Sequence, residues 1–257
     1  MNTEENLKII ELRNYLIKPD TRDRFIKYFE SHFIDSQKEL GGYPLGQFTV
    51  KNDDDKFFWI RGFKDMKARV AFLCAFYEQG LAWKKFGPEA NEMMLDSDDV
   101  YLLRPLNDRK DSQDLSQTVS SRAFEKLKAF VAIDFYYSEK NHLDNLINFF
   151  QADYVPFLNS LKINDTTLWV SEMAENDFPH LPVIQDSNLL VAISSFENES
   201  EYQTKLKQIN LANAELKKQM QKLINDRKSL MLYSTRKSFI GNSSLEKNLN
   251  LEAGFTR

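Results

Sequence analysis

Charged and aromatic side chains alternate along two predicted strands, and they are the residues of this sequence that could do chemistry. Glu11, Arg13 and Tyr15 occupy every second position of one apolar run. Because side chains on a strand point alternately to its two faces, these three share one face. Together with Arg61 on a later strand, Arg13 could grip a carboxylate or an enolate in a bidentate manner. The pattern indicates a polar pocket for a small anionic or aromatic ligand.

A strand in the second half carries a related set, with Asp134 and Tyr136 two positions apart. If the pocket is catalytic, an acid or base must reach the substrate, and Glu11 and Asp134 are the candidate bases. The plainer interpretation is an internal ion-pair network in which Arg13 meets Asp134 without a ligand, because buried charges must be paired. The residues alone leave both interpretations open.

Aromatic and amide side chains at the predicted pocket mouth extend this set. Trp59, Trp83 and Asn91 could line the entrance, although aromatic residues at such spacings are also typical of a core. The candidate ligand-binding residues are Glu11, Arg13, Tyr15, Trp59, Arg61, Trp83, Asn91, Asp134 and Tyr136.

Metal and cofactor motifs are not found in the sequence. The single cysteine, Cys74, excludes an internal disulfide and a cysteine-based zinc finger. The three histidines show no HxH or HExxH spacing, and no glycine-rich dinucleotide or phosphate-binding loop occurs. Asp53–Asp55 lacks the spacing of a calcium loop and is predicted to be a hairpin turn. We therefore predict no metal and no cofactor.

Composition indicates an ordinary globular protein. The chain has 257 residues, only 8 Gly and 7 Pro, and a net charge of −4. The length predicts two domains. The net charge shows none of the positive excess that is typical of nucleic-acid-binding proteins. No apolar run approaches the roughly 18 residues that a membrane span requires. The polar start of the sequence shows no secretory signal, so a cytoplasmic protein is expected unless a leader was removed.

The order of predicted elements is β-α-β-β-α-β in each half. In the first half, the predicted strands are 7–17, 47–52, 56–63 and 100–104, and the helices are 22–40 and one from Asp65 onward. In the second half, the predicted strands are 128–137, 166–173, 189–196 and 229–236, and the helices are 141–161 and 199–226. We expect domains at 1–105 and 124–240, a linker at 106–123 and a polar tail at 241–257.

The two halves align as diverged copies of one domain. At an offset of 121 residues Tyr15 meets Tyr136, and Asp20 meets Asn141, both suited to cap a helix. The predicted fold class is α+β, with two tandem ferredoxin-like domains packed sheet-to-sheet as a dimeric-type α+β barrel. By strand alternation, Ile10 and Leu12 are expected under the helices, and the charged set that begins at Glu11 is expected in a polar, aromatic cavity between the sheets.

Three separated motifs resemble the NIPSNAP family. They are IIELRNYLIKPD at 9–20, AFYEQGLAWKKFGPEANEMMLDSDDVYLLRP at 75–105, and NDFPHLPV at 176–183. In the third motif His180 replaces an arginine that is common in the family, which weakens any anion-binding role for that position. The resemblance implies the ferredoxin-like, dimeric α+β barrel fold, and some animal members are linked to mitochondria and vesicle transport.

Two functions are compatible with that resemblance. The first is a binding or interaction module without catalysis, whose cavity holds a small anionic or aromatic molecule. The alternative is a cofactor-independent monooxygenase or isomerase acting on an enolisable or aromatic substrate. Fold does not decide between them, so enzymatic activity stays open, as does assembly into a homo-oligomer.

Overall fold

The structure is a computed structural model that describes residues 6–106, 119–120, 128–211, 214–236 and 238. The first half contains β1 (Asn6–Leu7), β2 (Ile9–Ile17), α1 (Arg22–His32), α2 (Ile34–Glu39), β3 (Tyr43–Val50), β4 (Asp53–Phe63), α3 (Met66–Leu73), the π-helical η1 (Cys74–Gln79), α4 (Leu81–Met93), β5 (Met94–Asp96) and β6 (Val100–Leu106). The remainder contains β7 (Val119–Ser120), β8 (Phe130–Ser138), α6 (Leu143–Phe149), η2 (Phe150–Tyr154), α7 (Val155–Ser160), β9 (Thr166–Ser171), β10 (Leu189–Phe196), α8 (Glu199–Leu211), α9 (Ala214–Leu223) and β11 (Ile224–Ser234).

Eight strands close into one antiparallel barrel. The order runs β4-β3-β11-β8-β10-β9-β6-β2, and β2 pairs with β4 to complete the ring. The two halves join where β3 pairs with β11 and where β6 pairs with β9. The short β5 adds to the free part of β2. The expected α+β barrel is confirmed.

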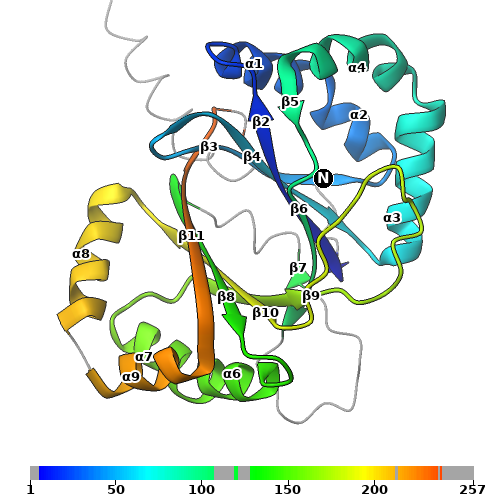
Figure 1. Cartoon of the computed structure of the whole chain (residues 1–257). Helices are drawn as coiled ribbons and strands as arrows, with labels where there is room; N and C mark the ends of the chain where they lie inside the picture. The colour runs from blue at the N-terminus through cyan, green and yellow to red at the C-terminus, as the bar shows by residue number, and fades with distance from the viewer. Residues whose placement is uncertain (1–5, 107–118, 121–127, 212–213, 237, 239–257) are drawn as a thin grey trace, which may run out of the picture.

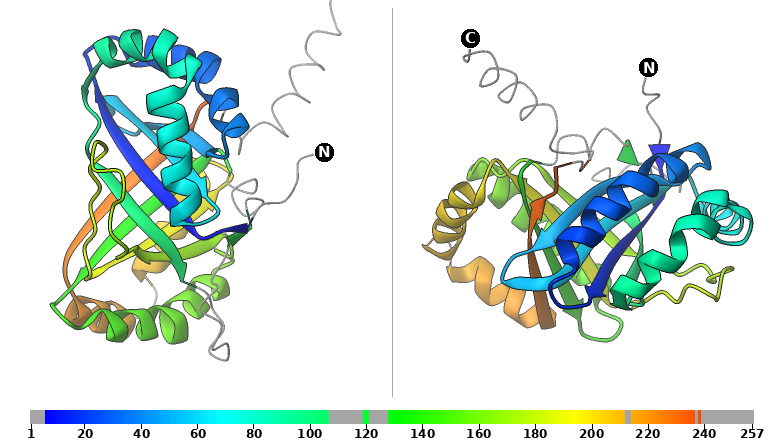
Figure 2. Two further views of the ribbon diagram at one scale, coloured as in Figure 1. Left: turned by 90° about the vertical axis from the view of Figure 1, so that its right-hand side faces the viewer. Right: turned by 90° about the horizontal axis from the view of Figure 1, so that it is seen from above.

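The helices lie outside the barrel in two groups (Figure 1). Helices α1 to α4 cover the sheet of the first half, where α1 and α3 contact β4 and α2 contacts β3. Helices α6 to α9 cover the second half, where α6 and α8 contact β10 and α9 contacts β11. Figure 2 shows the barrel between the two helical layers. Each half therefore has its own space between sheet and helices.

The interior of the barrel is apolar, and this corrects the expected polar cavity. One cluster drawn almost entirely from the strands fills it and includes Ile10, Leu12, Trp169 and Phe135. The other face of β2 points at the helices. An eight-stranded barrel is only wide enough for side chains to fill it, and buried charges need partners that the helices can supply.

Several element ends also differ from the sequence prediction. Asp20 and Asn141 are not helix caps but stand in the left-handed region, at φ 61° and 64°, directly before the capping residues. Short polar residues tolerate that conformation. The hairpin turn is Lys51–Asn52, while Asp53–Asp55 belongs to β4. The predicted helix 199–226 is replaced from Ile224 onward by β11.

Most of the predicted linker and all of the predicted tail lie outside the described residues. Of residues 106–123, the structure describes Leu106 and the two residues of β7, and the tail 241–257 lies outside the described residues. The domain boundaries at 105 and 124 therefore stay predictions.

Gly80 separates η1 from α4 where no other residue fits. A β-carbon on Gly80 would lie 2.3 Å from the backbone oxygen of Phe76, which cannot move as a side-chain end could. We expect Gly80→Ala to lower the free energy of unfolding by roughly 1–3 kcal/mol through overpacking. Urea denaturation measures this loss. The exposed neighbour Glu78 is the control, since Glu78→Ala should change stability by less than about 0.5 kcal/mol; equal effects would contradict the prediction.

Candidate functional site

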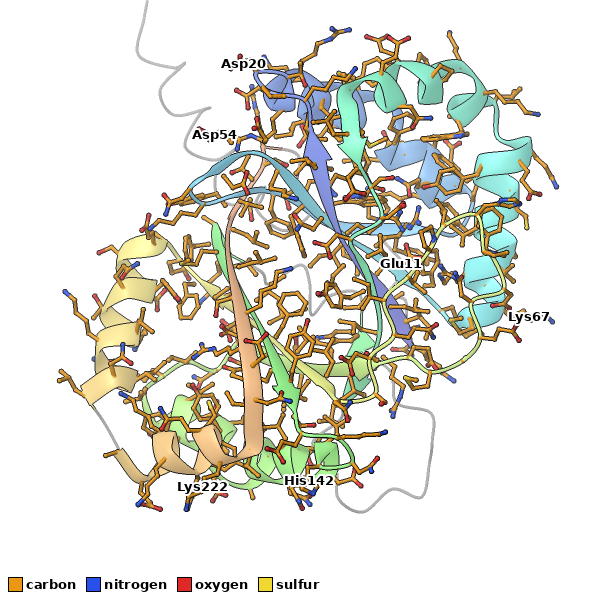
Figure 3. All side chains as sticks on the ribbon, in the orientation of Figure 1. Glu11, Asp20, Asp54, Lys67, His142 and Lys222 are labelled. Atoms are coloured by element: carbon orange, nitrogen blue, oxygen red, sulfur yellow. The ribbon has the colours of Figure 1, made fainter. Side chains whose placement is uncertain are left out.

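A fully buried carboxylate lies between the sheet of the first half and α3 (Figure 3). Both oxygens of Glu11 accept hydrogen bonds from guanidinium groups. Arg61 donates through Nη2 at 2.7 Å and Nε at 3.0 Å, Arg13 through Nη1 at 2.9 Å, and Arg69 through Nε at 2.7 Å. The three arginines are at most 1% exposed. The structure thus unites three residues of the predicted set, Glu11, Arg13 and Arg61, with one residue from a helix.

Neutral polar groups complete the shell around this cluster. Arg13 Nε donates to the Tyr15 hydroxyl at 2.8 Å. Arg61 Nη1 donates to Gln37 Oε1 at 3.0 Å and to the Tyr77 hydroxyl at 3.3 Å. The guanidinium carbon of Arg61 also lies 5.0 Å from the ring centroid of Trp59. Tyr15 and Trp59 therefore belong to this cluster, and their ligand-binding role stays a prediction.

Electrostatics hold the cluster in its charged state. Burial opposes ionisation of Glu11, but Arg61, Arg13 and Arg69 outweigh it and hold the pKa of this carboxyl well below its usual range. Burial also opposes the charge on Arg13, and the neighbouring Tyr15 and Glu11 still raise its pKa. A carboxylate that is inaccessible and hard to protonate is not a general base, so the candidate role of Glu11 as a base is wrong.

Two further predictions at this site need correction. Arg13 does not meet Asp134, because the barrel wall separates the two helical layers and each residue has a partner on its own side. Asn91 is exposed on α4 and lines neither helix-covered space. Trp83 does lie beside Trp59, and both line a small cavity of about 30 Å³ next to the cluster.

The third sequence motif helps to close this region. Asn176 Oδ1 accepts from Arg69 Nη1 at 3.0 Å, and Asn176 Nδ2 donates to the Leu181 carbonyl at 3.0 Å. Phe178 is buried in the same core as the helices. His180 is exposed. The loop from the second half therefore seals the arginine cluster of the first.

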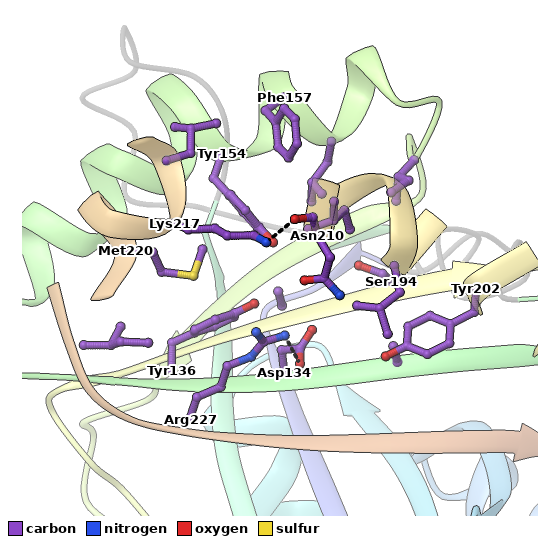
Figure 4. Close-up of a pocket in the computed structure, with 18 of the residues that line it drawn as sticks. Asp134, Tyr136, Tyr154, Phe157, Ser194, Tyr202, Asn210, Lys217, Met220 and Arg227 are labelled. Carbon is purple, nitrogen blue, oxygen red and sulfur yellow. Dashed lines mark hydrogen bonds and ion pairs between the residues drawn. The ribbon is translucent and has the colours of Figure 1, made fainter. Parts of the chain in front are cut away.

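The corresponding space in the second half is open. A cavity of about 450 Å³ lies between the barrel and helices α6 to α9 (Figure 4). Its lining residues from the strands are Ala132, Asp134, Tyr136, Ala192, Ser194, Phe196, Ile224 and Arg227, and the chief ones from the helices are Tyr154, Phe157, Leu158, Tyr202, Leu206, Ile209, Asn210, Leu216, Lys217 and Met220. A volume of about 300–1,000 Å³ is typical of small-molecule sites.

An ion pair forms the polar floor of this cavity. Arg227 Nη2 donates to Asp134 Oδ1 at 2.9 Å, and the Ser229 hydroxyl donates to the same oxygen. The guanidinium carbon of Arg227 stands 5.0 Å from the ring centroid of Tyr136. The side chains of Arg227 and Asp134 are 42% and 20% exposed. This pair is more accessible than the buried cluster, and a ligand could reach it.

The two tyrosines beside the pair are hydrogen-bonding groups rather than bases. Burial raises the pKa of Tyr136 well above its ordinary value, and the nearby Asp134 adds to the effect. Burial likewise raises the pKa of Tyr154. Both phenols are neutral at physiological pH, so they can donate to an oxygen of a bound molecule.

Helix α8 covers the cavity and packs on the sheet at its Tyr202 end, where the Tyr202 ring contacts Phe130 and Phe196. None of its residues is buried, although Tyr202, Leu206 and Ile209 face the cavity. Apolar side chains that cover empty space would gain buried area from an apolar ligand. The helix is the natural cover of the site.

Sequence reasoning missed the residues that complete each site. Arg69 has a signal that could have found it, because it is a charge in an otherwise apolar helical run. Arg227 has no such signal, since it falls between the predicted helix 199–226 and the predicted strand 229–236. Its place opposite Tyr136 follows from the β11–β8 register.

Metal and membrane features are not found in the described part of the chain. In those ranges no three or more His, Cys, Asp or Glu residues gather closely enough to hold a metal ion. Likewise, none of the described helices is both long enough and apolar enough to cross a membrane.

Comparisons with known proteins agree with this architecture. Residues 10–108 match the NIPSNAP family model. A proposed monooxygenase from Lactobacillus acidophilus NCFM is similar in structure, with a TM-score of 0.54, 14% identity, and coverage of 89% of this chain and 94% of that one. A proposed monooxygenase from Fusobacterium nucleatum gives a TM-score of 0.57 at 11% identity, covering 89% and 92% of the two chains.

A third solved structure extends over the same length. An anthrone oxidase-like protein matches with a TM-score of 0.55 and 8% identity, covering 92% of this chain and 97% of its own. At such identities the three structures show a shared fold and no more. No curated protein matches this chain.

Proposed function

We propose that the protein, whose residues 10–108 match the NIPSNAP family model, is a small-molecule binding module whose ligand site is the cavity of the second half. The observation that carries the proposal is the contrast between the two helix-covered spaces. The first is filled by a buried charge network, and the second is an open cavity of about 450 Å³. A volume of this size with an accessible ion pair on its floor suits a small-molecule ligand.

The chemistry of the lining indicates the class of ligand. Phe157, Leu206 and Met220 offer apolar contact to a flat or branched body. At the floor, Arg227 has further N–H donors beyond the one that binds Asp134, and these suit a carboxylate or phenolate. The best fit is a small aromatic or aliphatic molecule with one acidic group.

Calorimetric titration with 2-naphthoate tests the proposal, with its alcohol counterpart 2-naphthalenemethanol as an uncharged probe. Arg227→Gln should weaken naphthoate binding by about tenfold or more, because a charge-assisted hydrogen bond is worth about 1.5–3 kcal/mol. The same variant should leave the alcohol unaffected. Ala192→Leu, which narrows the cavity, should weaken both probes.

The matched control is Arg104→Gln, at an exposed arginine on β6 outside the cavity. It should bind both probes as the unaltered protein does. Absence of binding to the unaltered protein, or equal losses for Arg227→Gln and Arg104→Gln, would contradict a binding site on this floor.

The second candidate function is a cofactor-independent monooxygenase or isomerase. Its support is that Asp134 is a carboxylate within reach of a ligand in the cavity, together with the descriptions of the full-length structural neighbours. Oxygen consumption in the presence of anthrone, an enolisable aromatic ketone, tests it. Turnover that Asp134→Asn abolishes would favour the enzymatic function, whereas binding of anthrone without turnover would favour the binding module.

Two further sequence expectations stay predictions. They are a cytoplasmic location and self-association, the latter from the resemblance to dimeric barrels. Cell fractionation and sedimentation velocity would test them separately.

A further inference from the structure

The buried cluster of the first half carries more positive than negative charge. Arg13, Arg61 and Arg69 surround one carboxylate, Glu11, and all four side chains are at most 1% exposed. Among the described residues, no other acidic side chain forms an ion pair with any of these arginines. Burying an unbalanced charge is costly. The cluster is therefore short of negative charge.

A small cavity lies beside the cluster, and three of its lining residues bond to Arg13 or Arg61. Its volume is about 30 Å³, and its walls include Tyr15, Tyr77, Gln37 and Trp59. The remaining walls are apolar and aromatic side chains, namely Phe25, Phe29, Phe33, Phe76, Trp83, Ala90 and Met94. A cavity needs roughly 10–15 Å³ to hold one water molecule. This one fits a single small occupant and excludes a polyatomic organic ligand.

The polar side chains that line this cavity have N–H or O–H groups left to donate. The hydroxyls of Tyr15 and Tyr77 accept from Arg13 and Arg61, so their own protons must point elsewhere. In the described residues neither hydroxyl donates to a protein acceptor. The Gln37 carbonyl oxygen is likewise taken by Arg61, which leaves the amide N–H groups to face away from that arginine.

An orphaned buried donor completes the pattern. Trp59 Nε1 is buried and has no hydrogen-bond partner, although indole N–H groups nearly always find one when buried. Its side chain is 1% exposed and lines the same cavity. Four side chains that carry donors therefore line this space, and among the described residues no protein acceptor is bonded to the Trp59 indole N–H.

We propose that this cavity binds one monoatomic, monovalent anion of the size of chloride, held by Tyr15, Tyr77, Gln37 and Trp59 and attracted by Arg13 and Arg61. The anion supplies both the missing acceptor and part of the missing negative charge. Tyr15 does not supply this charge as a tyrosinate, because burial raises its pKa despite the adjacent Arg13. The site is independent of the ligand cavity in the second half.

Bromide is the probe, because it resembles chloride and scatters X-rays anomalously. Crystals grown in sodium bromide should show an anomalous peak in contact with the four donors. In solution, the unfolding midpoint should rise with bromide or chloride compared with gluconate at equal ionic strength, since a ligand of the folded state stabilises it. A water molecule at the site together with halide-independent unfolding would overturn the proposal.

Tyr77→Phe removes one donor and keeps the ring. It should weaken the apparent affinity for bromide by about tenfold, and Tyr15→Phe serves as the second variant if Tyr77→Phe does not fold. Tyr101→Phe is the matched control, because its hydroxyl bonds to Tyr137 away from this cavity. Halide stabilisation that is the same in Tyr77→Phe and Tyr101→Phe would place the effect elsewhere and refute the site.

Discussion

Replacing Glu11 with glutamine should destabilise the folded protein by roughly 3–5 kcal/mol, the cost of removing one partner from a buried ion pair. Glu11 is the carboxylate that Arg13, Arg61 and Arg69 share. The neutral amide keeps the shape of the side chain, but it leaves three buried cations without a counter-charge. The side-chain NH2 group of the glutamine also places N–H donors against the N–H donors of the guanidinium groups.

Urea denaturation at pH 7 measures this loss. The control is Glu92→Gln, an exposed glutamate on α4, which should change the free energy of unfolding by less than about 0.5 kcal/mol. A loss below about 1 kcal/mol in Glu11→Gln would mean that solvent or another group compensates the arginines.

The loss should also depend on pH. The pKa of Glu11 is held well below its usual range in the folded state, so its charge contributes stability that is fully present above the unfolded value of about 4.3. This contribution disappears as the pH falls from that value through the folded pKa. The difference between the unaltered protein and Glu11→Gln should therefore be constant near neutrality and shrink below about pH 4.

Truncation of Phe135 should cost roughly 3–5 kcal/mol, as for a large core aromatic residue. Phe135 is fully buried in the barrel interior, and its ring centroid lies 4.7 Å from that of Tyr101. A closed ring of paired strands cannot collapse into the space left by Phe135→Ala. The apolar contacts are therefore lost without replacement.

Phe157→Ala is the matched comparison. Phe157 lies on α7, is half-buried and already faces the open cavity. Removing its ring enlarges an existing space, so the expected loss is below about 1.5 kcal/mol. Thermal or urea unfolding of both variants gives the comparison. Equal losses would show that the surroundings of Phe157 are packed as tightly as the barrel interior, which would contradict an open cavity beside α7.

The strands and the family motifs were accessible from local pattern. The run that becomes β10 was predicted at 189–196, and its limits match the structure. The alternation of Glu11, Arg13 and Tyr15 correctly placed them on one face, because alternation is a property of any extended chain. Arg61 could be added for the same reason, and it lies directly across the β2–β4 pair from Glu11.

Alternation could not predict which face of β2 lies in the barrel interior and which lies under the helices. Alternation says that Ile10 and Glu11 face opposite sides, but either side could have been the barrel interior. The structure places Ile10 inside and Glu11 under the helices. The deciding partner, Arg69, comes from a helix 58 residues away in the chain. Only the packing of α3 on β4 brings it to the carboxylate.

The sequence by itself determined the alternation of strands and helices and the shared face of the charged residues, because these depend on neighbours in the chain. The α+β barrel was expected from the internal repeat and the family resemblance. The tertiary structure decided the location and state of the two candidate sites. It pairs Arg227 with Asp134 through the β11–β8 register, and it fills one helix-covered space while leaving the other open. These outcomes depend on contacts between distant segments, and the same alternating pattern is compatible with either face of the sheet.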